Sequence, residues 1–322
     1  MPCSIAVHIV EQGSRSRWSE LGGNTRQVDS LSVEHVTALM AAAKEVAEAA
    51  PAQSRPKSMR RSEIRSLRST AGGGGRERAA LLDAVSIECA AAIAQTHLLL
   101  EGICDLLRCA VSRDGALHMS ATAVLVRSAL EISGQTMWLL DLTIDGTERV
   151  RRYLTWRFDD LKQMRYLMQS TSGDDATDIA ASGFADNVEQ QLVRSVTACG
   201  WGARPQRVKP KSLEPACLLD GDGRAVKLPG MGEFAMIAAM SRDAYKILSL
   251  PAHGQRYGFH ASFLREHVGG QARIFSSTIE PELLVRWTCM SVALPALCLA
   301  RWNGLTEGRL MKLFSPLFGP LT

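Results

Sequence analysis

Several features that would identify a protein class at once are missing from this sequence. None of the eight cysteines forms a Cys-x-x-Cys pair, and structural zinc sites usually need such paired ligands. The di-iron bundle motif Glu-x-x-His does not occur. The apolar stretch 288–300 has 13 residues and contains Pro295, whereas a membrane span needs about 20 residues. We therefore expect no metal, no cofactor and no membrane partner.

Aromatic residues make up only 6% of the 322 residues, but 46% are hydrophobic, which is enough for a full core. No signal peptide is recognisable at the start of the sequence, and most cysteines lie in apolar helical segments, where a free thiol behaves as a small hydrophobic group. A reducing cytoplasmic location is the expectation.

Positive charge is concentrated in one segment. Residues 51–80 hold eight basic and two acidic residues, so this segment carries +6 while the rest of the chain carries −2. A cluster of this kind attracts phosphate groups, but beside a linker it is more often simply solvated. Its surroundings favour a linker, because it contains Pro56 and the glycine run 72–75.

Apolar residues recur at helical spacing along most of the chain. Helices are predicted at 32–50, 76–111, 119–142, 146–169, 175–199, 231–250, 257–268, 281–302 and 305–314. Residues 216–228 are predicted to form a small β-hairpin that turns at Asp220-Gly-Asp-Gly. The expected fold is an all-α multi-helix bundle with one small β-hairpin. Its domains are 1–75, an N-terminal helix with a flexible basic linker, and 76–322, the bundle.

One predicted helix, 119–142, gathers its strong polar groups on a single stripe. On a helical wheel these groups fall within about 120° of one another, and Trp138 lies among them. They are Arg127, Glu131, Gln135 and Asp141. The stripe is either the solvated edge of an amphipathic helix with an ordinary ion pair, or a row that faces a cleft between helices.

The segment 241–254 offers a second set of candidates. Tyr245 and Ser249 share one helix face, and Pro251 ends the helix so that His253 lies in the loop that follows. A histidine in such a loop either packs against the helix end or acts as an acid or base near neutral pH. His260 and His267 follow at seven-residue intervals, a spacing of about 10 Å on a helix, which is too long for one shared metal ion.

A third pattern is Arg113-Asp-Gly-Ala-Leu-His118. It resembles the Arg-polar-x(3–5)-His signature of HEPN-type ribonucleases, which are small helical bundles of toxin and defence systems. More broadly, three sets of motifs resemble a group of uncharacterised bacterial all-helical proteins that are distantly HEPN-like. The motifs are 125–131 with 138–141, Arg149-Val-Arg-Arg152, and Tyr245-Lys-Ile-Leu-Ser249 with His253-Gly254.

This resemblance implies that five side chains meet in one cleft: Arg127, Glu131, Tyr245, Ser249 and His253. It also implies a homodimer and a metal-independent ribonuclease. His253 or His118 would then activate a ribose 2′-hydroxyl, while Arg127 or Arg113 would stabilise charge on the phosphate. The basic segment 51–80 would help to hold RNA.

Two other functions fit the same residues. One is a non-catalytic helical bundle that binds a small ligand or a partner protein, with Trp138, Arg127 and Tyr245 as anchors. The other is an enzyme of specialised metabolism whose carboxylated substrate pairs with Arg127. If Arg127 and Glu131 faced bulk water, an interaction protein would be the default hypothesis.

Overall fold

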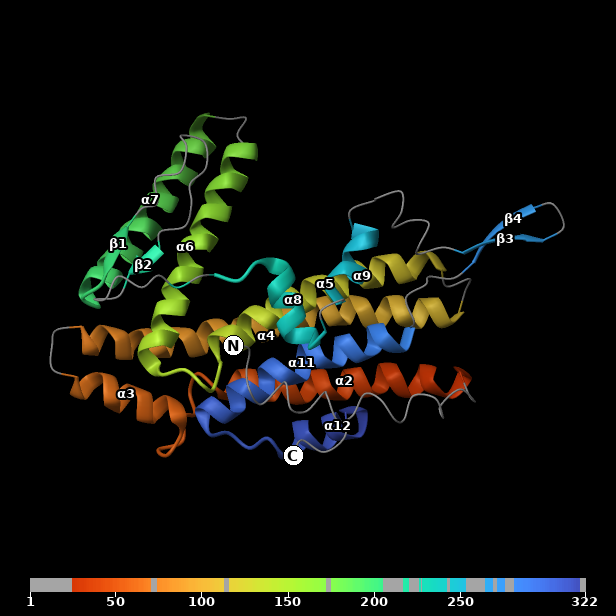
Figure 1. The fold of residues 1–322 in the computed structure, drawn as a ribbon, viewed down its shortest axis with the longest axis horizontal. Coiled ribbons are helices and arrows are strands. Elements are labelled where there is room, and N and C mark those ends of the chain that lie inside the picture. Colours follow the sequence, from red (N-terminus) through yellow and green to blue (C-terminus); the bar gives the residue numbers. More distant parts are fainter. Residues whose placement is uncertain are drawn as a thin grey trace. The chain divides into compact units, whose positions relative to one another are not determined.

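The computed structural model describes residues 25–70, 74–112, 116–171, 175–204, 217–219, 226, 228–241, 244–252, 264–268, 271–275 and 281–318. Helices dominate this described part (Figure 1), so the all-α prediction is confirmed. They are α2 (Thr25–Ala49), α3 (Met59–Ser69), α4 (Gly75–Ser112), α5 (Ala116–Leu139), α6 (Gly146–Thr171), α7 (Asp175–Ala198), α8 (Met231–Ala239), α9 (Ala244–Ala252), α11 (Pro281–Asn303) and α12 (Gly308–Phe318).

The chain divides into two compact units. The first comprises Met1–Met59, Ser86–Thr143 and Pro229–Thr322, and the second comprises Arg60–Val85 and Ile144–Leu228. Helix α4 contributes residues to both. This division differs from the predicted one at residue 75, because the first unit joins α2 to helices from the end of the chain. Local composition does not show which distant segments pack into one unit, so the sequence could not predict this division.

In the first unit, α11 contacts both α5 and α2, and α5 also contacts α8 and α9 (Figure 1). The approach of α5 to α8 is close enough to require glycine, since a Cβ on Gly134 would lie 1.8 Å from the backbone oxygen of Phe234. The hydroxyl of Ser133 donates to the backbone oxygen of Ser291 in α11. Phe234 and Trp302 are among the largest fully buried side chains of this core.

The second unit contains α3, α6, α7 and the first turns of α4. Arg149 in α6 is completely buried and donates to Glu63 of α3 through Nε at 3.3 Å and Nη2 at 3.1 Å. Arg165 joins α6 to α7 by ion pairs of 2.7 Å with both Asp186 and Glu189. Charged side chains therefore connect the helices of this unit.

Helix α3 lies where the sequence predicted a flexible linker. Its Ile64 and Leu67 are buried and are spaced three residues apart, which places them on one helix face. Arg60, one of the eight basic residues of the segment, is also buried and pairs with Asp83 at 2.6 Å. The linker prediction gave weight to charge and glycine and overlooked this short apolar pair.

Three further elements differ from prediction. The expected helix 231–250 is two helices, because α8 ends at Ala239 and is followed by Met240, whose φ of 49° is left-handed. The strand Leu264–Val268 (β3), paired with Gln271–Phe275 (β4), occupies the end of the expected helix 257–268. The strand Cys217–Leu219 (β2) pairs with the earlier Gly202–Arg204 (β1), so the hairpin predicted within 216–228 is not shown.

Two described helices are long and apolar enough, by length and composition alone, to cross a membrane. They are the α4 portion Gly75–Leu106 and the α11 portion Leu283–Asn303. The sequence argument considered only a charge-free stretch, whereas the second of these helices includes Arg286 and Arg301. Buried core helices of soluble proteins have the same composition, so the absence of a membrane partner stays a prediction.

Candidate functional site

Arg127 of α5 is held by two side chains. Its Nε donates to Oε1 of Glu131 at 2.8 Å, and its Nη2 donates to the hydroxyl of Tyr245 in α9 at 2.9 Å. The guanidinium carbon also lies 4.7 Å from the centre of the Tyr245 ring, so the charge meets the negative face of the ring. The side chains of Arg127 and Glu131 are only 16% and 19% exposed. Three of the side chains named from the sequence therefore meet, away from bulk water.

The side chains of this cluster connect helix α5 to helix α9. A part-buried guanidinium with a carboxylate at hydrogen-bond distance is already neutralised, and the Tyr245 hydroxyl links α9 to α5. A carboxylated ligand would have to compete with Glu131 for Arg127. The hypothesis of a carboxylated substrate on Arg127 thus requires a rearrangement of this pair.

Trp138 and Asp141 make other contacts. Trp138 lies eleven residues after Arg127, which is about 16 Å along a helix, and its ring packs edge-on against Phe234 at 5.9 Å. Asp141 follows the end of α5, where its carboxylate accepts bonds from the backbone nitrogen and hydroxyl of Thr143 at 3.0 and 2.7 Å. The helical wheel gave a common direction for these residues but ignored their separation along the axis.

The remaining predicted residues fall in two groups. Ser249 is buried one turn after Tyr245, and its hydroxyl donates to the Tyr245 backbone oxygen. Arg113, His253 and the side chain of His118 lie outside the part of the chain that the structure describes. Their role in a ribonuclease site stays a prediction.

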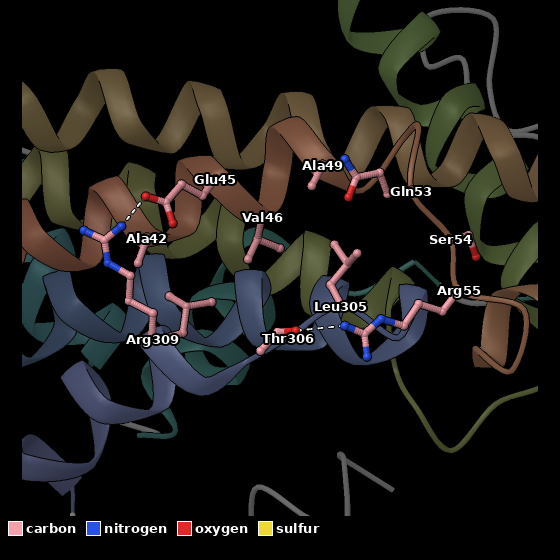
Figure 2. Close-up of a pocket in the computed structure, with 11 residues that line it drawn as sticks. Ala42, Glu45, Val46, Ala49, Gln53, Ser54, Arg55, Leu305, Thr306 and Arg309 are labelled. Carbon is pink, nitrogen blue, oxygen red and sulfur yellow. Dashed lines mark hydrogen bonds and ion pairs between the residues drawn. The ribbon is translucent and has the colours of Figure 1, made fainter.

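A pocket that the sequence did not indicate lies between the end of α2 and the turn that joins α11 to α12 (Figure 2). We call it the Arg55 pocket; its volume is about 310 Å³. The residues that define it are Glu45, Val46, Arg55, Leu305, Thr306 and Arg309. Arg55 reaches across to Thr306, and Arg309 pairs with Glu45 at the other end. Polar groups thus flank an apolar floor.

The backbone around this pocket is fixed by the end of α11. Gly304 adopts a left-handed φ of 67°, its nitrogen donates to the oxygen of Arg301 at 3.0 Å, and Leu305 donates to Ala300 at 2.8 Å. These bonds form the Schellman arrangement that closes a helix. The nitrogen of Arg55 donates to the backbone oxygen of Asn303 at 3.1 Å, which ties the two sides of the pocket together.

A second, larger cavity of about 630 Å³ is open along α2 and α4, with α11 contributing residues. We call it the α2–α4 groove. Its apolar lining includes Ala43, Ala47, Ala90, Ala94, Leu100 and Val292. His97, also in the lining, pairs with Glu101 at 3.4 Å, and Lys44 pairs with Glu48 at 3.9 Å. The groove therefore combines a lining of small apolar side chains with charged residues.

The described residues contain no group of three or more His, Cys, Asp or Glu side chains that could hold a metal ion. Two buried thiols are poor nucleophiles. Burial raises the pKa of Cys289 to about 12, and burial together with the nearby Glu77 raises the pKa of Cys199 to about 12.

Comparison of the chain with family models, with curated proteins and with solved structures gives no match.

Proposed function

We propose that this protein is a helical bundle that binds a small, mainly apolar molecule in the α2–α4 groove. The observation that carries the proposal is a volume of about 630 Å³ whose lining is mainly aliphatic and includes several alanines, with charged residues such as Lys44 and Glu48 beside them. Ligand pockets commonly have volumes of roughly 300–1,000 Å³ and an apolar lining with few polar groups. This is the small-ligand hypothesis of the sequence analysis, placed at a different site.

The small size of the lining residues supports a bound molecule. Ala43 and Ala47 on α2, and Ala90 and Ala94 on α4, are each one helical turn apart, so two rows of methyl groups line the groove. A hydrophobic ligand would bury this surface at about 25 cal/mol per Å² of apolar area.

The polar groups of the groove suggest how such a ligand is oriented. The hydroxyls of Thr96 and Ser291 bond to backbone oxygens of their own helices, at 2.9 and 2.8 Å. His97, whose side chain is 23% exposed, has ring nitrogens that donate or accept according to its protonation. We therefore assign one polar group of the ligand to His97.

Binding is tested with a neutral fluorescent probe, N-phenyl-1-naphthylamine, titrated into the full-length protein. Ala94→Trp places an indole in the groove and is expected to weaken binding at least about tenfold, a loss of about 1.4 kcal/mol. Ala80→Trp is the matched control, because Ala80 is an exposed alanine of the same helix that does not line the groove. Equal binding by both variants, or no saturable binding by the wild type, would contradict the proposal.

A second candidate function is the HEPN-like, metal-independent ribonuclease. It rests on the resemblance in the sequence, which implied that Arg127 and Tyr245 lie together; these two residues, 118 positions apart, are hydrogen-bonded. Its test is cleavage of varied RNAs in EDTA by the wild type, His253→Ala and His118→Ala. Loss of cleavage in one histidine variant, with unchanged circular dichroism, would support it. An inactive wild type would rule against it.

A further inference from the structure

The Arg55 pocket presents two guanidinium groups to an apolar floor. Arg55 Nη2 donates to the hydroxyl of Thr306 at 2.9 Å. Among the residues that the structure describes, no carboxylate forms an ion pair with Arg55. Within the described part of the chain, the side-chain partner of Arg55 is thus a neutral hydroxyl, which accepts a hydrogen bond but does not compensate the charge. An anion can therefore approach Arg55 without displacing a described acidic side chain.

The second guanidinium, that of Arg309, is occupied by a carboxylate of the protein itself. Arg309 and Glu45 form an ion pair in which each side chain is 59% exposed. Exposed pairs of this kind contribute little stability and exchange easily with other anions. Glu45 thus shows which chemical group suits this position, and it is held weakly enough to be replaced.

We propose that the Arg55 pocket is a binding site for a small organic carboxylate. The acid group is held by Arg55 together with Thr306, whose hydroxyl can accept from the guanidinium and donate to the ligand at the same time. A planar guanidinium binds a carboxylate through two parallel hydrogen bonds. The apolar part of the ligand lies on Val46 and Leu305, which Figure 2 shows between the two arginines.

The size and rigidity of the pocket limit the ligand. A volume of about 310 Å³ is at the lower end of the range for ligand sites, so a single ring or a short chain fits. The bond from Arg55 to Asn303 and the closed end of α11 hold both sides of the pocket before any ligand arrives. Such preorganisation reduces the entropy lost on binding. This site is separate from the α2–α4 groove and does not depend on the function proposed there.

Binding of sodium benzoate to the full-length protein is measured by isothermal titration calorimetry, with benzamide as the neutral isostere and phenyl phosphate as the alternative anion. Arg55→Gln is expected to weaken benzoate binding about tenfold or more. Glu45→Gln frees Arg309 and is expected to strengthen it several-fold. Glu34→Gln is the control, since it makes the same charge change at another exposed residue of α2, one that lines neither the Arg55 pocket nor the α2–α4 groove.

Four results would overturn the proposal: no benzoate binding up to about 10 mM, benzamide binding as tightly as benzoate, no loss in Arg55→Gln, or equal gains in Glu45→Gln and Glu34→Gln. The last result would mean that only the overall charge matters. Tighter binding of phenyl phosphate than of benzoate would also contradict the proposal, since it would mean that the pocket prefers a phosphate ester to a carboxylate. Unchanged benzoate binding by Ala94→Trp is expected, which keeps this site distinct from the groove.

Discussion

The contact between α5 and α8 makes Gly134→Ala the most informative single substitution in the first unit. On an exposed helix the change would stabilise the protein by up to about 1 kcal/mol, because alanine is the better helix former. At Gly134, however, the new Cβ would lie 1.8 Å from the backbone oxygen of Phe234, where ordinary contacts begin near 3.4 Å. Helix α8 must therefore move by roughly 1.5 Å, and Phe234 loses its packing. Overpacking usually costs about 1–3 kcal/mol, and a backbone obstacle places this variant at the upper end, near 3 kcal/mol.

Gly183→Ala provides the matched control for this prediction. Gly183 lies inside α7, where nothing comes within 4 Å of an added Cβ, so this variant should gain about 0.5–1 kcal/mol. Both variants are compared with the wild type by urea denaturation followed by far-UV circular dichroism. A Gly134→Ala protein as stable as the wild type, or a change of the same sign in both variants, would refute the close approach of α8 to α5.

Two other predictions concern buried groups. Glu63→Gln removes the negative charge from a carboxylate that pairs with the fully buried Arg149 and should destabilise the protein by about 3–5 kcal/mol. Glu45→Gln, in an exposed pair, should change stability by less than about 1 kcal/mol. Similar losses for both variants in urea denaturation would contradict the burial of Arg149. Because burial raises the pKa of Cys289 from about 9 to about 12, the unfolded chain releases this proton first, so stability should fall as the pH rises between these values. Cys289→Ala should show a shallower decline in denaturation curves measured across that range; an unchanged decline would rule out this thiol as its source.

The helical periodicity of the sequence predicted most elements because long amphipathic helices repeat one local rule. Its errors lie where the local rule is weak. Helix α3 has only one short apolar pair, Ile64 and Leu67, within a charged segment that resembled a linker. The break between α8 and α9 depends on the left-handed conformation of Met240. Methionine rarely adopts this conformation, so the sequence does not predict a break at this position.

The predicted site was also limited by its reliance on local spacing, which does not show how different helices pack against each other. The pair of Arg127 and Glu131 could be found from their spacing, since residues four apart share a helix face. Tyr245 could be named only as a candidate, because its contact with Arg127 depends on how α9 packs against α5. A helical wheel also merges residues that share a direction but not a height, which is why Trp138 was grouped with Arg127 and contacts Phe234 instead.

The Arg55 pocket, proposed above as a carboxylate site, could not be found by a search for motifs. Arg55 and Thr306 are 251 residues apart, and each lies in a connection between helices, where no helical periodicity marks a residue. In the sequence, Arg55 counted as one charge among eight in a solvated segment. What distinguishes it is the end of α11: the left-handed Gly304 closes that helix and sets Leu305 and Thr306 opposite Arg55. Arg60, five residues later in the same segment, instead forms an ion pair with Asp83. The two arginines lie in the same basic segment, so the sequence does not distinguish them. Their partners in the fold do: Arg60 forms a structural ion pair with Asp83, whereas Arg55 bonds to the hydroxyl of Thr306, the arrangement on which the proposed ligand site depends.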